Sequence, residues 1–123
     1  MSSKDLRKAK VLAWQSIVKR ELDQLVKIYE DFLEIDDLLD MNGKSGLHIA
    51  CMKGDLEIVS LFLDAGADAN LLDKDGRTPI HFAVGVIKGG PIIKELLKYK
   101  ADINHKSNGG ESPVMKAIYM SNT

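Results

Sequence analysis

The sequence predicts an all-α fold of stacked helix-turn-helix units, on two observations. Landmark residues recur at a fixed spacing: Gly43 and Gly76 are 33 residues apart, as are His48 and His81, while Gly76 and Gly110 are 34 apart. Between these landmarks apolar residues fall three and four positions apart, as on one face of a helix, and no segment alternates at period two for long. Such a repeat predicts a solenoid, in which each unit buries its apolar face against the next.

Two helices are expected before residue 35. Residues 6–16 and 21–33 contain no Gly or Pro and carry apolar residues at helical spacing. The acidic and apolar residues that follow end at Asn42-Gly43, a strong turn signal.

The second unit contains a short helix over residues 47–53, which ends at Gly54. Asp55 then caps a strongly apolar helix that ends at Gly66. The third pair of helices is expected over residues 79–87 and 91–99, with the one extra residue of this unit between them, and a last helix runs from Ser112-Pro113 toward Met120.

The stretch DKDGRTPIHFA sets a tight turn directly against a helix start. Gly76 adopts the positive φ that a turn demands, the Thr78 hydroxyl caps the helix, and Pro79 suits its first position, where no backbone donor is needed.

The repeated pattern resembles the ankyrin-repeat family: a turn, a TPLH-type helix start, a glycine, and a second helix ending LL-x-x-GAD-x-N. GRTPIHFA and ELLKYKADIN match this pattern in the third unit, and LHIACMKGDLEIVSLFLDAGADAN matches it in the second. The resemblance covers residues 40–120 well and 6–39 weakly.

The resemblance implies one ankyrin-repeat domain over residues 1–123, an all-α solenoid of about 3.5 repeats with hairpin-like loops. Its parts are an N-terminal capping-like repeat (6–39), a second repeat (40–72), a third (73–106) and a truncated fourth (107–123). Because the fourth repeat stops after its first helix, we expect the sequence to be a fragment of a longer protein; the alternative is that a partner covers the open end.

The sequence departs from the family pattern at three places, and two of these departures are expected to affect helix ends. Ser45-Gly46 replaces Thr-Pro, which should loosen that helix start, since glycine costs about 1 kcal/mol in a helix. Lys100 replaces the glycine equivalent to Gly66, so its helix must end without that permissive residue. Met115 replaces the histidine of the fourth unit.

Scaffold roles follow from the resemblance for residues of the turns and helix starts. These are Gly43, His48, Gly54, Gly66, Gly76, Thr78, Pro79, His81 and Pro113. The two histidines are expected to be neutral and to bond turn backbone between neighbouring units.

Composition limits the kinds of partner that the protein can bind and the cellular compartments in which it is expected. Seventeen basic and 18 acidic residues argue against bulk attraction to nucleic acid or anionic membrane. Residues 1–20 carry six Lys/Arg and one Asp, residues 21–40 carry eight acids and one Lys, and the two halves should neutralise each other on adjacent helices. Cys51 is the only cysteine, and no signal peptide or membrane span is evident, so a cytoplasmic protein is expected, with the nucleus not excluded.

Motifs that imitate chemical sites are incomplete. Gly43-Lys44-Ser45 lacks the upstream glycine of a phosphate-binding loop, and the calcium-like run from Asp73 has Val84 at its twelfth position. His48 and Cys51 lack further zinc ligands at suitable spacing. We therefore expect no catalytic residues, no cofactor and no metal.

In the family, recognition usually takes place on a concave face made of turn tips and first helices. The equivalent positions here are Met41, Asn42, Lys44, Met52, Lys53, Lys74, Asp75, Arg77, Gly85, Val86, Asn108, Glu111, Tyr119 and Met120. Apolar and basic residues among them predict a protein or peptide ligand with an apolar anchor and acidic character. The alternatives are a substrate-recruiting or targeting domain of a larger enzyme, and a structural spacer or self-association solenoid.

Overall fold

The computed structural model describes residues 2–121, except for the side chains of residues 118–121. These residues form seven helices, and the all-α repeat fold is confirmed. The helices are α1 (Ser3–Lys19), α2 (Leu22–Asp31), α3 (Gly46–Lys53), α4 (Leu56–Asp64), α5 (Pro79–Ala83), α6 (Gly90–Lys98) and α7 (Pro113–Ser121). None of the described helices is both long and apolar enough to cross a membrane.

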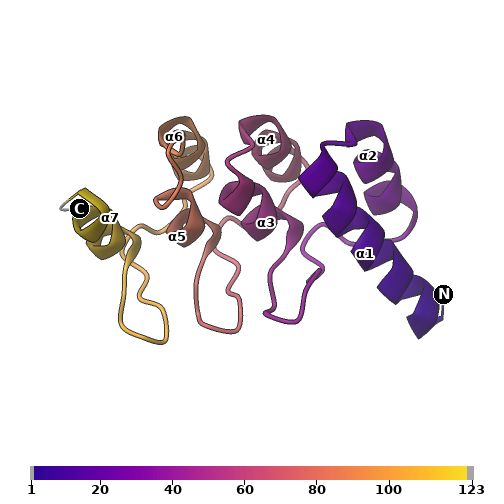
Figure 1. Ribbon diagram of the computed structural model, residues 1–123, viewed down its shortest axis with the longest axis horizontal. Coiled ribbons are helices and arrows are strands. Elements are labelled where there is room, and N and C mark those ends of the chain that lie inside the picture. The colour runs from indigo at the N-terminus through magenta and orange to yellow at the C-terminus, as the bar shows by residue number, and fades with distance from the viewer. Residues whose placement is uncertain (1, 122–123) are drawn as a thin grey trace.

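The helices stand in two rows (Figure 1). One row, which we call the outer row, holds α2, α4 and α6; the other, the inner row, holds α1, α3, α5 and α7. Neighbours within the inner row contact one another, and α4 contacts α6 in the outer row. Three long loops precede α3, α5 and α7 and project away from the outer row; we call them the finger loops, residues 32–45, 65–78 and 99–112.

One continuous apolar core runs along the stack. Each helix pair contributes side chains that only the next pair can cover, which is why a single unit is not stable alone. Fully buried members include Ile17, Leu47, Ile58, Leu63, Ile80, Ile92 and Leu96.

Equivalent places in successive units adopt the same left-handed backbone, even where the sequence departs from glycine. Gly43, Gly76 and Gly110 have φ of 75°, 73° and 82° in the three finger loops. Lys100 has φ 65° at the place where Gly66 has 95°, so its helix ends in the usual geometry despite its side chain. Arg20 likewise has φ 58° after α1.

The expected helix over residues 79–87 was too long: α5 ends at Ala83. The segment that follows is a series of tight turns, in which Gly85 N–H donates to Phe82 O and Gly89 N–H donates to Val86 O. A side chain at Gly89 would place Cβ 2.1 Å from Ala83 O, so the chain turns too sharply there for a helix to continue.

Gly46 has a packing role that the sequence did not reveal. A Cβ at this position would lie 2.2 Å from Phe62 Cζ and 2.7 Å from the Tyr29 hydroxyl. The Tyr29 and Phe62 rings meet edge to face, with centroids 5.1 Å apart, and fill this space. Ser45 caps α3 by accepting from His48 N–H at 3.4 Å. Gly46 is therefore required by contact between helices, and the expected loosening is not the dominant effect.

Replacing Gly46 by alanine should destabilise the fold by about 1–3 kcal/mol, because the new methyl group displaces packed aromatic rings. Gly90→Ala is the matched control: no atom lies within 4 Å of its added Cβ, and it begins a helix. Urea unfolding followed by circular dichroism measures both variants. Equal stability of Gly46→Ala and Gly90→Ala would contradict this account of Gly46.

Candidate binding face

Each of the first two finger loops is shaped by a carboxylate that binds its own backbone. Asp40 Oδ1 accepts from the N–H groups of Asn42 and Lys44, at 3.0 and 2.9 Å. Asp73 repeats this arrangement one unit later, with N–H groups two and four residues downstream both at 2.9 Å. The loops are thus rigid turns rather than open linkers.

Neighbouring finger loops are also bonded to one another. Lys74 N–H donates to Asn42 O at 2.9 Å, and Asn108 N–H donates to Asp75 O at 2.8 Å. Asn108 Nδ2 adds a bond to Lys74 O at 3.0 Å. The side chain of Asn108, expected to contact a partner, therefore already joins two loops.

His48 and His81 tie α3 and α5 to the next finger loop. In both, Nδ1 accepts from the backbone N–H at the helix start, that of Ser45 or Thr78, at 3.1 Å. Because Nδ1 accepts, the proton of the neutral ring stays on Nε2. Nε2 of His48 then donates to Arg77 O at 3.0 Å, and Nε2 of His81 donates to the carbonyl oxygen of Glu111 at 3.1 Å.

Both imidazoles are buried, with 0% and 1% of the residue exposed. Burial is the main cause that lowers the pKa of His48 and of His81 below the ordinary value of 6.5. A second proton on Nδ1 would also face a backbone N–H. Burial and these hydrogen bonds therefore favour the neutral form of both imidazole rings.

We call the surface formed by the finger loops and the exposed sides of α3, α5 and α7 the inner face. Most of the expected contact residues are exposed there, and Met41 and Met52 expose 88% and 45% of their surface. The other exposed ones are Asn42, Lys53, Lys74, Asp75, Gly85 and Asn108. Those half-buried are Arg77, Val86 and Glu111. The side chains of Tyr119 and Met120 lie outside the described residues.

Lys44 was expected to be an exposed contact residue, and this is wrong. It is buried, with 8% of its surface exposed. Its ammonium lies 5.4 Å from the centroid of the Phe82 ring, because the residue sits at the base of its loop, where the chain meets α5. Lys116 Nζ lies 5.9 Å from the same centroid and donates to His81 O at 3.1 Å.

Three residues escaped the sequence reasoning: Phe82 and Lys116 of this face, and Ile87 in the turns that follow α5. Lys116 occupies the repeat position held by Ile49 and Phe82 in the preceding units, and a charged residue in an apolar position was an available signal. Ile87 is 101% exposed in the turns after α5, where the third unit has its extra residue.

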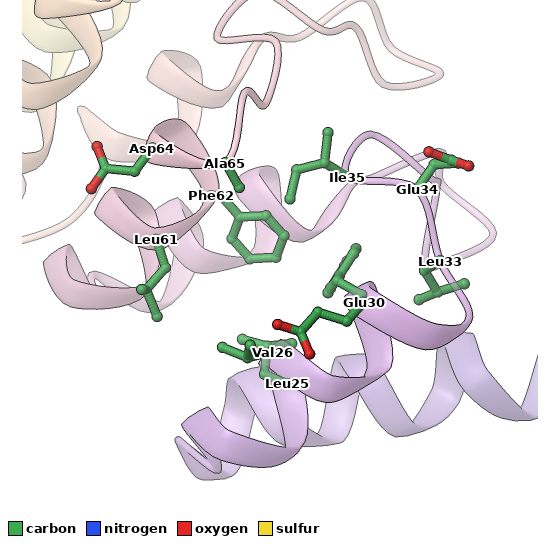
Figure 2. A pocket seen from close by; sticks show the side chains of 11 residues that line it. Leu25, Val26, Glu30, Leu33, Glu34, Ile35, Leu61, Phe62, Asp64 and Ala65 are labelled. Carbon is green, nitrogen blue, oxygen red and sulfur yellow. The ribbon is translucent and has the colours of Figure 1, made fainter.

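A hollow lies between α2 and α4, two helices of the outer row (Figure 2). It has a volume of about 580 Å³ and an apolar lining that includes Leu25, Val26, Leu61 and Phe62. The carboxylates that line it are those of Glu30, Glu34 and Asp64, and Asp64 accepts from the Tyr99 hydroxyl.

The basic half of the first 40 residues lies mostly on α1 and the acidic half begins on α2, and these two helices contact each other. Within residues 2–121, none of the ion pairs joins α1 to α2. Arg20 instead reaches Asp55 and Glu57 in the next unit, and these contacts raise the pKa of its guanidinium. Of the acids of α2, Glu30 lines the hollow.

The described residues contain no group of three or more His, Cys, Asp or Glu side chains placed to share a metal ion. Cys51 is fully buried, and burial raises the pKa of its thiol. It is therefore not presented as a nucleophile.

A family model described as "Ankyrin repeats (3 copies)" matches residues 16–107 and 47–123. The Neurogenic locus Notch protein of Drosophila melanogaster is 31% identical over 105 residues, which are 81% of this chain and 4% of that protein. A putative ankyrin repeat protein of fowlpox virus, FPV031, is 40% identical over 70 residues, 57% of this chain and 20% of the relative. The tyrosine-protein kinase HTK16 of Hydra vulgaris is 36% identical over 78 residues, 63% of this chain and 10% of the kinase.

The geometry of His48 and His81 predicts that acid weakens the fold. Because both pKa values are lowered in the folded protein, the unfolded chain binds more protons below about pH 6.5. Stability should therefore be full above that pH and fall progressively from about pH 6.5 to about pH 5.5. Urea midpoints measured across this range check the direction.

Two variants test whether His48 and His81 cause the loss of stability in acid. His48→Gln and His81→Gln should each be less stable at neutral pH but show a smaller loss on acidification than the wild type. A wild-type midpoint that is constant from about pH 7.5 to about pH 5.5 would refute the buried neutral rings.

Proposed function

This chain belongs to the ankyrin-repeat family, and from that premise we propose that it is a non-catalytic module that binds a protein or peptide on its inner face. Ankyrin repeats in general serve protein–protein interaction. The observation that carries the proposal is the combination of exposed apolar side chains with rigid, mutually bonded finger loops on one face.

Rigid loops favour binding because little conformational entropy is lost when a partner docks. Met41 and Met52 supply exposed, adaptable apolar surface, and Ile87 adds a fully exposed side chain after α5. Lys53, Lys74 and Arg77 add positive charge, which Asp75 offsets only in part. We infer a partner with an apolar anchor and acidic character.

The chain spans between 4% and 20% of the length of the three relatives named above, and one of these is a tyrosine kinase. This favours a second candidate function, in which the module recruits or positions a substrate for a larger enzyme. The single cysteine, which is free and buried, suits a reducing compartment, and we propose the cytoplasm as the location.

The inner face is tested with peptides selected from a displayed random library by the wild-type chain. Met52→Glu and Arg77→Glu should each lower the affinity for the selected peptides by about tenfold or more. Met52→Glu removes an apolar contact, and both substitutions repel an acidic ligand. Binding is measured by fluorescence anisotropy.

Leu61→Glu is the matched control. Leu61 exposes 39% of its surface, close to the 45% of Met52, but lines the hollow between α2 and α4. Its substitution should leave the affinity unchanged. Unaltered binding by both inner-face variants, or loss with Leu61→Glu alone, would refute the inner face as the site.

A further inference from the structure

The hollow between α2 and α4 has an equivalent one unit later, between α4 and α6. Asp64 lies 34 residues after Glu30, and Tyr99 lies 34 residues after Ala65, so the two pairs hold the same repeat positions. In the later groove the Tyr99 hydroxyl donates to the Asp64 carboxylate. Glu30 and Ala65 both line the hollow. The hollow therefore lacks the side chain that joins the two helices one unit later.

Ala65 and Tyr99 also have similar backbone geometry. Each is the residue that ends its helix, with φ −83° after α4 and φ −97° after α6. The methyl group of Ala65 is too short to bridge two helices. Among the described residues α4 contacts α6, whereas α2 and α4 have no comparable contact. The small side chain thus helps to leave the hollow open.

The Glu30 carboxylate has no basic partner in the described part of the chain. Figure 2 shows it beside Val26, directed into the space between α2 and α4. Among residues 2–121 no basic side chain lies within 4.0 Å of its oxygens, and the same holds for Glu34, which also lines the hollow. A cation that enters the hollow meets a carboxylate that is free to bind it.

The surroundings of this carboxylate are apolar and negatively charged. Val26 and Leu61 line the hollow and expose 43% and 39% of their surface. Burial is the main cause that raises the pKa of Tyr29, and the nearby carboxylates of Asp37 and Asp36 raise it further. A cation on an apolar stem, as in Lys and Arg, complements both properties.

We propose that the hollow is a second binding site, which takes one Lys or Arg side chain of a partner peptide. The stem of that side chain lies along Val26 and Leu61, and its cationic end donates to the Glu30 carboxylate, as Tyr99 donates to Asp64. The volume of about 580 Å³ falls within the range of about 300–1,000 Å³ common for ligand clefts. Residues beside the cation therefore also fit. This site is separate from the inner face.

The first test fills the hollow from within the chain. Ala65→Tyr places at the end of α4 the residue type that ends α6, and its hydroxyl should donate to Glu30. The melting temperature should rise by about 3 °C or more. Ala65→Ser is the matched control, because its hydroxyl is too short to reach α2. A melting temperature of Ala65→Tyr no higher than that of Ala65→Ser would overturn the proposal, since the hollow would not hold a donor on a long side chain.

The second test uses peptides selected from a displayed random library by the double variant Met52→Glu/Arg77→Glu, in which the inner face is altered. The selected peptides should contain Lys or Arg. Replacing that residue by Gln should lower the affinity for the wild-type chain by about threefold or more in fluorescence anisotropy. Glu30→Gln should remove this preference, and Ala65→Tyr should abolish binding. Asp31→Asn is the matched control, because this acid of α2 does not line the hollow, and it should keep the preference.

Other outcomes distinguish this site from the inner face. Selected peptides without Lys or Arg, or peptides that bind Glu30→Gln and the wild type alike, would overturn the cation site and leave the inner face unaffected. Sedimentation that shows self-association of the free chain, lost in Glu30→Gln, would overturn the peptide as occupant in favour of a second copy. Peptides selected by the wild type that ignore Met52→Glu and Arg77→Glu but lose affinity to Glu30→Gln would overturn the inner face and support the hollow.

Discussion

The hydrogen bonds from His48 and His81 to the backbone of the next finger loop are the constraint on which the rest of the structure depends. Each ring accepts at Nδ1 from the start of its own helix and donates from Nε2 to a carbonyl one unit away. One side chain thereby fixes both the helix start and the position of the following loop. Since the candidate contact residues lie on these loops, the histidines also set the shape of the inner face.

The parts of the fold that repeat were predictable from the sequence. The spacing of His48 and His81, the turn glycines and the Thr78-Pro79 helix start are local or periodic features, and they lead to the repeat fold that the family match supports. Lys100 shows the limit of this reasoning, since the stacked neighbours impose a left-handed backbone on a residue that does not favour it.

What the sequence could not predict depends on contacts between residues that are distant in the sequence and on how the turns fold. The Phe62 ring reaches the space beside Gly46 from another helix, and no local pattern encodes that approach. The burial of Lys44 was missed because its neighbour Phe82 lies on another unit, and a lysine beside a turn is normally exposed. The end of α5 at Ala83 likewise depends on how one extra residue is folded into a tight turn.

The central claim, that neutral histidines hold the finger loops, is tested most directly by long-range proton–nitrogen NMR of the imidazoles near pH 7.5. We predict that His48 and His81 both carry their single proton on Nε2; a proton on Nδ1 of either ring, or a doubly protonated ring, would contradict the account.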